Sequence, residues 1–178
     1  MDRRFSRIKA YYDAQDREKH LQGQLPMRST EVGFWGVSHL EDVQIFFLQK
    51  RFPPEMRFLD IGCGDGRVVA VASLYMMAHG VEYDAELAHV GVQALKNLSL
   101  RASITCADIL DIDIAQYDVI YMYADRNFSY LKEKLLRELK GTLYLYHDTY
   151  HPDFLVKQKT TWIGQIPIFA YRAPTLQE

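Results

Sequence analysis

The chain has 178 residues, 48% of them hydrophobic and 13% aromatic, so it can form one α/β domain with a core but not two full domains. Its formal net charge of −2 gives no overall basic field for a nucleic acid, which disfavours a large RNA substrate but leaves a local basic patch open. The longest apolar run, residues 68–78, is too short to cross a bilayer, and no apolar stretch follows the basic N-terminal residues. We therefore expect a cytoplasmic protein without membrane contact.

The two cysteines, Cys63 and Cys106, lie far apart and have no cysteine or histidine at metal-ligand spacing. Neither a metal site nor a disulfide framework is indicated. We expect both thiols to be reduced.

Residues 1–30 are strongly charged and read as an N-terminal helical extension to one domain over residues 31–178. Phe5, Ile8 and Tyr12 recur at spacings of three and four residues, which predicts an amphipathic helix. Such a helix would lie on the domain or cover its mouth, and a mobile solvated helix is the alternative. Further on, Ser38 and Glu41 form the pattern of a capping box before a helix that ends at the prolines of residues 53–54.

From residue 56 onward, apolar strands alternate with amphipathic helices. Strands are expected over residues 56–61, 77–83, 103–108, 118–123 and 142–147, and helices over residues 68–76, 84–98 and 127–140. Gly141 is expected to be the residue that terminates the last of these helices, and a pair of strands is expected around residues 164–167. This order predicts a Rossmann-like, doubly wound, mostly parallel sheet with helices on both faces and an antiparallel edge.

The glycine-rich stretch FLDIGCGDGR, residues 58–67, follows the first strand and opens a helix. A dinucleotide fingerprint would require a third glycine at position 67, where the chain has Arg67, and no Gly-Lys-Ser/Thr follows for a phosphate loop. Asp60 and Asp65 suit a cationic ligand, one that carries a sulfonium and an ammonium group, better than a pyrophosphate. A turn with a purely structural role is the alternative.

Two further acidic residues lie at the ends of the next two strands. Glu82 lies about twenty residues beyond the loop, where a carboxylate accepts hydrogen bonds from ribose hydroxyls in dinucleotide folds. The alternative, a charge at a helix N-terminus, suits Asp84 better than Glu82. Asp108 could accept a hydrogen bond from an adenine amine while the backbone N–H of Ile109 meets a ring nitrogen, although loop aspartates are common.

In this order, DIGCGDG, GVEYD and CADIL resemble the class I S-adenosylmethionine-dependent methyltransferases over roughly residues 31–172. The resemblance implies a seven-stranded sheet whose last strand is antiparallel, with S-adenosylmethionine as cofactor and S-adenosylhomocysteine as product. The residues that it assigns to cofactor binding are Trp35, Ser38, Asp60, Gly62, Cys63, Gly64, Gly66, Glu82, Tyr83, Asp108, Ile109 and Tyr123.

Within this class, four segments are similar to archaeal-type protein-lysine methyltransferases and their relatives. The segments are FWGVSHLEDV, FLDIGCGDGRVVAVAS, QYDVIYMYADRN and LKEKLLRELKGTLYLYHD. In that group the segment before the first helix reaches the methionine end of the cofactor, which corresponds here to residues 34–38.

The turn after the fourth strand reads MYADRN and contains no proline. Enzymes that methylate adenine or a glutamine amide carry an Asn/Asp-Pro-Pro-Tyr turn at this place, which grips a planar amine. The absence of this turn argues against planar amines as acceptors.

The acceptor is expected at the C-terminal ends of the strands. Tyr123, Asp125 and His147 are the candidates for catalysis, with Asp125 or His147 taking a proton. Phe34, Trp35 and Tyr146 could wall the channel with aromatic faces, which attract a cationic amine. Each candidate has a structural alternative, namely packing for the tyrosines, a satisfied histidine at a strand end, and a helix cap for Asp125.

The favoured interpretation is a protein methyltransferase that acts on lysine or a similar flexible amine. A small-molecule or RNA methyltransferase on the same scaffold is the first alternative, and a non-catalytic cofactor-binding or scaffold protein is the second. The sequence leaves open the acceptor, the number of methyl groups transferred and the oligomeric state.

Overall fold

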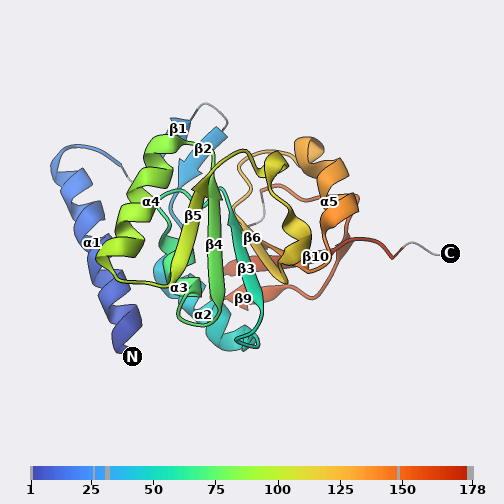
Figure 1. Cartoon of the computed structure of the whole chain (residues 1–178), viewed down its shortest axis with the longest axis horizontal. Helices are drawn as coiled ribbons and strands as arrows, with labels where there is room; N and C mark the ends of the chain where they lie inside the picture. Colours follow the sequence, from blue (N-terminus) through green and yellow to red (C-terminus); the bar gives the residue numbers. More distant parts are fainter. Residues whose placement is uncertain (1, 26, 31–32, 148, 176–178) are drawn as a thin grey trace.

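A computed structural model describes residues 2–25, 27–30, 33–147 and 149–175 (Figure 1). The helices are α1 (Arg3–Leu21), α2 (Leu40–Lys50), α3 (Arg67–Ala72), α4 (Ala85–Asn97) and α5 (Lys132–Glu138), with short 3-10 turns η1 (Ile109–Asp111), η2 (Ile114–Gln116) and η3 (Ser129–Leu131). The strands are β1 (Met27–Thr30), β2 (Gly33–Gly36), β3 (Arg57–Ile61), β4 (Met77–Glu82), β5 (Ala102–Cys106), β6 (Val119–Met122), β7 (Thr142–Tyr146), β8 (Val156–Lys157), β9 (Thr161–Ile163) and β10 (Ile166–Arg172).

The main sheet has the order β5-β4-β3-β6-β7-β10-β8, and β9 pairs with β10. The five strands from β5 to β7 run parallel to their neighbours, whereas β10 runs antiparallel to β7. The predicted doubly wound sheet with an antiparallel edge is confirmed. The expected count of seven strands is wrong. Among the described residues the sheet has eight strands, because the short strands β8 and β9 both pair with β10.

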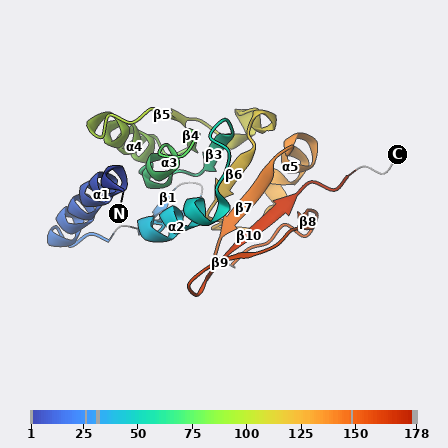
Figure 2. The same ribbon diagram turned by 90° about the horizontal axis from the view of Figure 1, so that it is seen from below.

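Alternate side chains along the central strands enter two hydrophobic cores, one on each face of the sheet. Phe58 and Tyr121 lie in the core that α1, α2, α3 and α4 cover. Leu59 and Ile120, their neighbours in the chain, lie in the opposite core under α5. Figure 2 shows the helices on the two sides of the sheet.

Helix α1 belongs to the first of these cores. Phe5, Ile8 and Tyr12 are at most 1% exposed and pack with α2 and α3 residues, so the prediction that this helix lies on the domain is confirmed. The alternative of a mobile solvated helix is wrong. Figure 1 shows α1 beside α4, and Arg7 donates a hydrogen bond to the carbonyl oxygen of Asn97 at 3.4 Å.

Several predicted helix ends are corrected. Helix α2 begins at Leu40 with His39 as its N-cap and without a side-chain capping bond, so the capping box of Ser38 and Glu41 does not form. Glu41 instead forms an ion pair with Lys9 of α1 at 3.0 Å. The predicted helix over residues 68–76 ends at Ala72, where the chain turns toward β4.

Gly141 is not the residue that terminates a helix, because α5 already ends at Glu138 with Leu139 as its C-cap. A glycine is needed there because a Cβ atom would lie 2.3 Å from the carbonyl oxygen of Asp118. The start of β7 passes so close to the backbone of Asp118, just before β6, that only a residue without a side chain fits. The hairpin of β1 and β2 was not predicted, since its two four-residue strands show no clear alternation.

The structure also bears on three expectations from composition. Both cysteines are free thiols, with Cys63 buried and Cys106 exposed. Among the residues described above, no three histidine, cysteine or acidic side chains gather as a metal ion would require. Within those same ranges, every helix is too short or too polar to span a membrane.

Candidate cofactor and acceptor site

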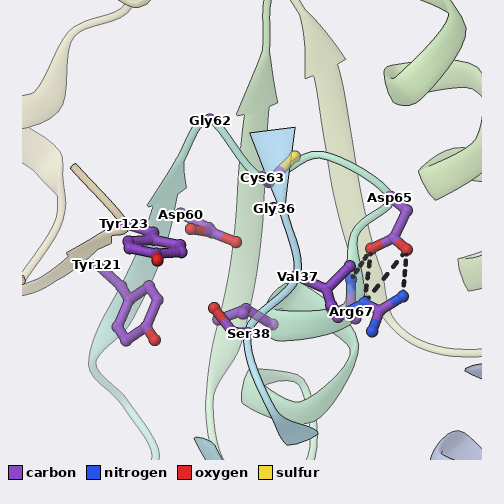
Figure 3. Close-up of a pocket in the computed structure, with 11 residues that line it drawn as sticks. Gly36, Val37, Ser38, Asp60, Gly62, Cys63, Asp65, Arg67, Tyr121 and Tyr123 are labelled. Atoms are coloured by element: carbon purple, nitrogen blue, oxygen red, sulfur yellow. Dashed lines mark hydrogen bonds and ion pairs between the residues drawn. The ribbon is translucent and has the colours of Figure 1, made fainter. Parts of the chain in front are cut away.

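The candidate site lies where the direction of strand addition reverses. The chain adds β4 and β5 on one side of β3 and then returns to add β6 on the other side, so a crevice opens at the C-terminal ends of β3 and β6. A pocket occupies this place (Figure 3). Its lining consists of Gly36, Val37, Ser38, Asp60, Gly62, Cys63, Asp65, Arg67, Val68, Tyr121 and Tyr123.

The glycine loop has a backbone that only glycine adopts readily. Gly62, Gly64 and Gly66 have φ angles of 71°, 53° and 78°, in the left-handed region. The N–H groups of Gly62 and Cys63 both donate to the carbonyl oxygen of Val81, at 2.9 and 3.1 Å. The loop is therefore held against the end of β4 by its own backbone.

Glu82 closes the other side of this loop. Its carboxylate accepts hydrogen bonds from the N–H of Gly64 at 2.7 Å and from the N–H of Asp84 at 2.9 Å, and the residue is buried. These bonds hold the carboxylate rigidly at the end of β4, which is the position of the predicted ribose acceptor. Asp84 is the N-cap of α4, as the alternative interpretation of this acidic pair suggested.

Asp60 is the buried acid at the end of β3. Burial raises the pKa of this carboxyl group well above its usual value of 3.8, and the nearby carboxylates of Glu82 and Asp65 raise it further. In Figure 3 its carboxyl group points into the space between Ser38 and Tyr123. A cation placed in this space would reverse the effect on the pKa, because it would favour the ionised form.

Asp65 lines the pocket, but its carboxylate is already paired with Arg67. The guanidinium group of Arg67 forms a bidentate ion pair with the Asp65 carboxylate (Figure 3). The shortest distance, between Nη2 and Oδ2, is 2.7 Å. The pair is a local one, because Asp65 lies two residues before Arg67, the first residue of α3. Asp60, the other aspartate of the loop, is not paired with Arg67.

The predicted adenine contacts lie at the end of β5. Asp108 is the N-cap of η1, and its Oδ1 accepts a hydrogen bond from the N–H of Leu110 at 2.9 Å. Ile109 begins the same 3-10 turn, and the N–H of Ala107 binds the carbonyl oxygen of Glu82 at 3.0 Å. The structure thus brings Asp108 and Glu82 to adjacent strand ends, with the exposed Tyr83 beside them.

Aromatic side chains gather at the ends of β6 and β7. Tyr123 meets Tyr146 edge to face at a centroid distance of 5.6 Å, and His147 lies 6.2 Å from Tyr123. The hydroxyl of Tyr146 donates to Oδ2 of Asp42 in α2 at 2.9 Å, and burial raises the pKa of Tyr146, with that carboxylate adding to the shift. Burial also raises the pKa of Tyr121, so both phenols are neutral at physiological pH.

A second cavity, of 280 Å³, adjoins this aromatic group and shares Tyr123 with the first pocket. Its lining is Tyr123, Ala124, Asp125, Thr149 and Tyr150. Of the three predicted catalytic residues, the structure therefore places Tyr123 and Asp125 on one cavity. His147 lies next to Tyr123 at the end of β7, and its φ of 74° turns the chain there.

The segment before α2 was predicted to reach the cofactor. Ser38 is buried and lines the first pocket, whereas the side chains of Phe34 and Trp35 fall outside the part of the structure that is described. The sequence did not predict a place at this site for Asp42, nor for three residues around the loop, Tyr12, Asp16 and Arg67. No local signal could have linked them, because Tyr12 contacts Asp65 across 53 positions of the chain.

Known proteins with related sequences are methyltransferases. Residues 58–144 match the family described as "Methyltransferase domain". A protein-lysine N-methyltransferase from Saccharolobus islandicus (strain REY15A) is 35% identical over 99 residues, which cover 50% of this chain and 60% of that protein. The chain thus aligns with less than two thirds of the length of this curated relative.

Solved structures share the fold at low sequence identity. An RNA methyltransferase from Salinibacter ruber in complex with S-adenosylhomocysteine has a TM-score of 0.68 and 15% identity, over 80% of this chain and 97% of that one. A magnesium protoporphyrin IX methyltransferase from Synechocystis PCC 6803 with bound S-adenosylhomocysteine has a TM-score of 0.60 and 13% identity, over 75% and 82%. The acceptors of these two proteins differ, so the shared scaffold does not identify an acceptor.

Proposed function

Because the chain carries a class I S-adenosylmethionine-dependent methyltransferase domain, we propose that it transfers a methyl group from S-adenosylmethionine to a protein lysine or a similarly flexible amine. The observation that carries the choice of acceptor is the cavity of Tyr123, Asp125 and Tyr150 beside the cofactor pocket. It offers aromatic faces and a carboxylate, which suit a cationic amine. S-adenosylhomocysteine is the product.

The cofactor would lie across the ends of β3, β4 and β5. Glu82 accepts from the ribose hydroxyls, and Asp108 with the N–H of Ile109 holds the adenine. The glycine loop passes beneath, and Asp60 faces the positive charge of the methionine end. The remaining contacts assigned to the cofactor are Ser38, Cys63, Tyr83, Tyr123 and Trp35.

When bound, S-adenosylmethionine would supply an activated methyl group for in-line transfer to the acceptor nitrogen, with S-adenosylhomocysteine as the leaving group. The chain must align the two atoms and exclude water rather than provide much acid–base chemistry. A lysine acceptor must first lose a proton, which costs about 4.6 kcal/mol at pH 7 for an ordinary pKa of ~10.4. Desolvation by the aromatic walls lowers this cost, and Asp125 or His147 takes the proton.

Incubation of the protein with S-adenosylmethionine labelled in its methyl group, together with a cell lysate, tests this function. Label should appear in protein, and hydrolysis of the labelled bands should release methylated lysine. A Glu82→Gln variant, which weakens the predicted ribose contact, should label protein far more weakly at the same cofactor concentration. Label confined to RNA or to small metabolites would contradict a protein acceptor.

A second experiment distinguishes a methyltransferase from a protein that binds the cofactor without transferring its methyl group. Calorimetric titration with S-adenosylhomocysteine should show a single site, and NAD should bind more weakly or not at all. If S-adenosylhomocysteine binds tightly but no fraction of the lysate is labelled, the protein is a cofactor-binding scaffold, and the proposed activity is wrong.

A further inference from the structure

Helix α1 contacts the glycine loop through residues that the cofactor motif does not include. We propose that α1 is part of the cofactor site, where Tyr12 and Asp16 clamp the second half of the loop through Asp65 and Arg67, so that docking of α1 and cofactor binding stabilise each other. The inference requires only that the domain binds its cofactor. It does not depend on the identity of the methyl acceptor.

The clamp centres on the guanidinium group of Arg67. Nη2 lies 2.7 Å from Oδ2 of Asp65 and 2.9 Å from Oδ1 of Asp16, while Nη1 lies 3.2 Å from Oδ2 of Asp16. One cation is therefore shared in two bidentate pairs, one with the loop and the other with α1. Such pairs fix orientation as well as distance.

Tyr12 supplies the second connection. Its hydroxyl donates to the backbone carbonyl oxygen of Asp65 at 3.1 Å, and its ring lies 5.1 Å from the guanidinium carbon of Arg67. Burial raises the pKa of this phenol well above its usual value, so the hydroxyl stays a donor at physiological pH. The ring and hydroxyl of Tyr12 and the carboxylate of Asp16 thus converge on residues 65–67, at the end of the loop.

The contact of Arg67 with Asp65 and Asp16 is largely shielded from solvent. The side chains of Arg67 and Asp65 are 6% and 4% exposed, and that of Asp16 is 24% exposed. Removing one partner of a buried ion pair leaves a charge without compensation, so the contact cannot be exchanged for water at little cost. By contrast, the pair of Lys9 and Asp13, one turn earlier in the helix, lies on the solvent side with Asp13 49% exposed.

The clamp acts on the peptide units next to those that hold the predicted ribose acceptor. The N–H of Gly64 binds Glu82, and the carbonyl oxygen of the next residue, Asp65, is the one that Tyr12 holds. Gly66 then packs against Gly91 of α4, where an added Cβ would lie 3.2 Å from the Gly91 Cα. The loop is thus fixed on three sides, and α1 is the side that comes from outside the nucleotide-binding core.

Mutual stabilisation follows from thermodynamic linkage. If α1 favours the loop conformation that binds the cofactor, then the bound cofactor must favour docked α1 by the same factor. The positive charge of Arg67 also partly compensates the carboxylate of Asp65, which is one of the charges that act on the buried acid Asp60. Loss of the clamp would loosen the loop and change the electrostatic environment of the pocket together.

Calorimetric titration with S-adenosylhomocysteine tests the proposal on the full chain. Asp16→Asn should raise the Kd about five- to twentyfold, and Tyr12→Phe should raise it about two- to fivefold. Asp13→Asn, which removes a carboxylate from the same helix without touching the loop, is the matched control and should stay within about twofold of the unaltered protein. Asp16→Glu keeps the carboxylate and should recover part of the affinity.

A second measurement separates positioning from stability alone. In the unaltered protein, S-adenosylhomocysteine should slow amide hydrogen exchange in α1, and this protection should be lost in Asp16→Asn. If Asp16→Asn lowers the denaturation midpoint while its Kd and the protection of α1 match Asp13→Asn, the helix has a structural role only and the proposal is wrong. If the unaltered protein does not bind S-adenosylhomocysteine, the proposed function itself fails, which is a distinguishable result.

Discussion

The two halves of the crevice are built in different ways. On the cofactor half, at the ends of β3 and β4, the backbone itself makes the site, with left-handed glycines and N–H groups bound to Val81 and Glu82. On the proposed acceptor half, at the ends of β6 and β7, aromatic side chains line the crevice and contact one another through their rings. Tyr123, at the border, is 41% exposed.

This difference explains why the two halves carry different amounts of information in the sequence. A backbone conformation that only glycine tolerates leaves a fixed pattern in the chain. A wall of aromatic rings can be made from many sequences, because it needs surface and shape rather than a particular spacing. The first half therefore predicts a ligand class, while the second half is compatible with several acceptors.

Glu82→Gln should break the cofactor half most strongly. An amide offers a single acceptor oxygen and no charge, so either the N–H of Gly64 or that of Asp84 loses its partner in a buried place. We expect the Kd for S-adenosylhomocysteine to rise on the order of 100-fold in calorimetry, from loss of about 3 kcal/mol in charge-assisted hydrogen bonds. Glu86→Gln removes an exposed carboxylate in the first turn of α4. This variant should bind S-adenosylhomocysteine as the unaltered protein does.

Asp125→Asn should affect the acceptor half and leave the other intact. Transfer of labelled methyl groups to protein should fall about tenfold, because the cavity loses its carboxylate next to Tyr123. The Kd for S-adenosylhomocysteine should stay within about twofold. Asp153→Asn, an exposed site further along the chain, serves as control. A parallel loss of cofactor affinity in Asp125→Asn would show that the two halves are not separable.

The buried acid Asp60 should make cofactor binding depend on pH. Its pKa is raised in the free protein, and a cationic ligand favours the carboxylate, so binding of S-adenosylmethionine should release a proton and strengthen as the pH rises toward that pKa. S-adenosylhomocysteine lacks the sulfonium charge and should release fewer protons. Titrations in two buffers of different ionisation enthalpy measure this difference, which Asp60→Asn should abolish.

The same shift has a consequence for folding. The folded protein holds the proton of Asp60 more tightly than the unfolded chain, so this residue's contribution to the free energy of unfolding is largest below pH 3.8 and decreases as the pH rises through the raised pKa. Asp60→Asn should remove this dependence. If the denaturation midpoints of both proteins change equally with pH, Asp60 is not the group responsible.

Gly141→Ala should have the smallest effect on either half of the crevice. A methyl group there would meet the carbonyl oxygen of Asp118, so urea denaturation should show a loss of about 1–3 kcal/mol in the free energy of unfolding. The Kd for S-adenosylhomocysteine should not change. Lys140→Ala, an exposed neighbour, should stay within about 0.5 kcal/mol of the unaltered protein.

The local parts of this fold could be predicted from the sequence because short-range patterns decide them. The central strands and the glycine loop are at their predicted places, since continuous apolar runs and left-handed glycines are local properties. The start of α2 was predicted wrongly because Glu41 binds Lys9 of a distant helix instead of capping its own. The hairpin of β1 and β2 was missed for want of a clear pattern.

The sequence by itself determined the order of the central strands and their helices, the kind of loop and the two acids that follow it. Only the tertiary structure decided how the charges are shared. It paired Arg67 with both Asp65 and Asp16, left Asp60 as a buried acid of the pocket outside this ion pair, and set Tyr146 against Asp42. The physical reason is that a hydrogen bond or ion pair depends on distances of about 3 Å between groups far apart in the chain, which no local pattern specifies.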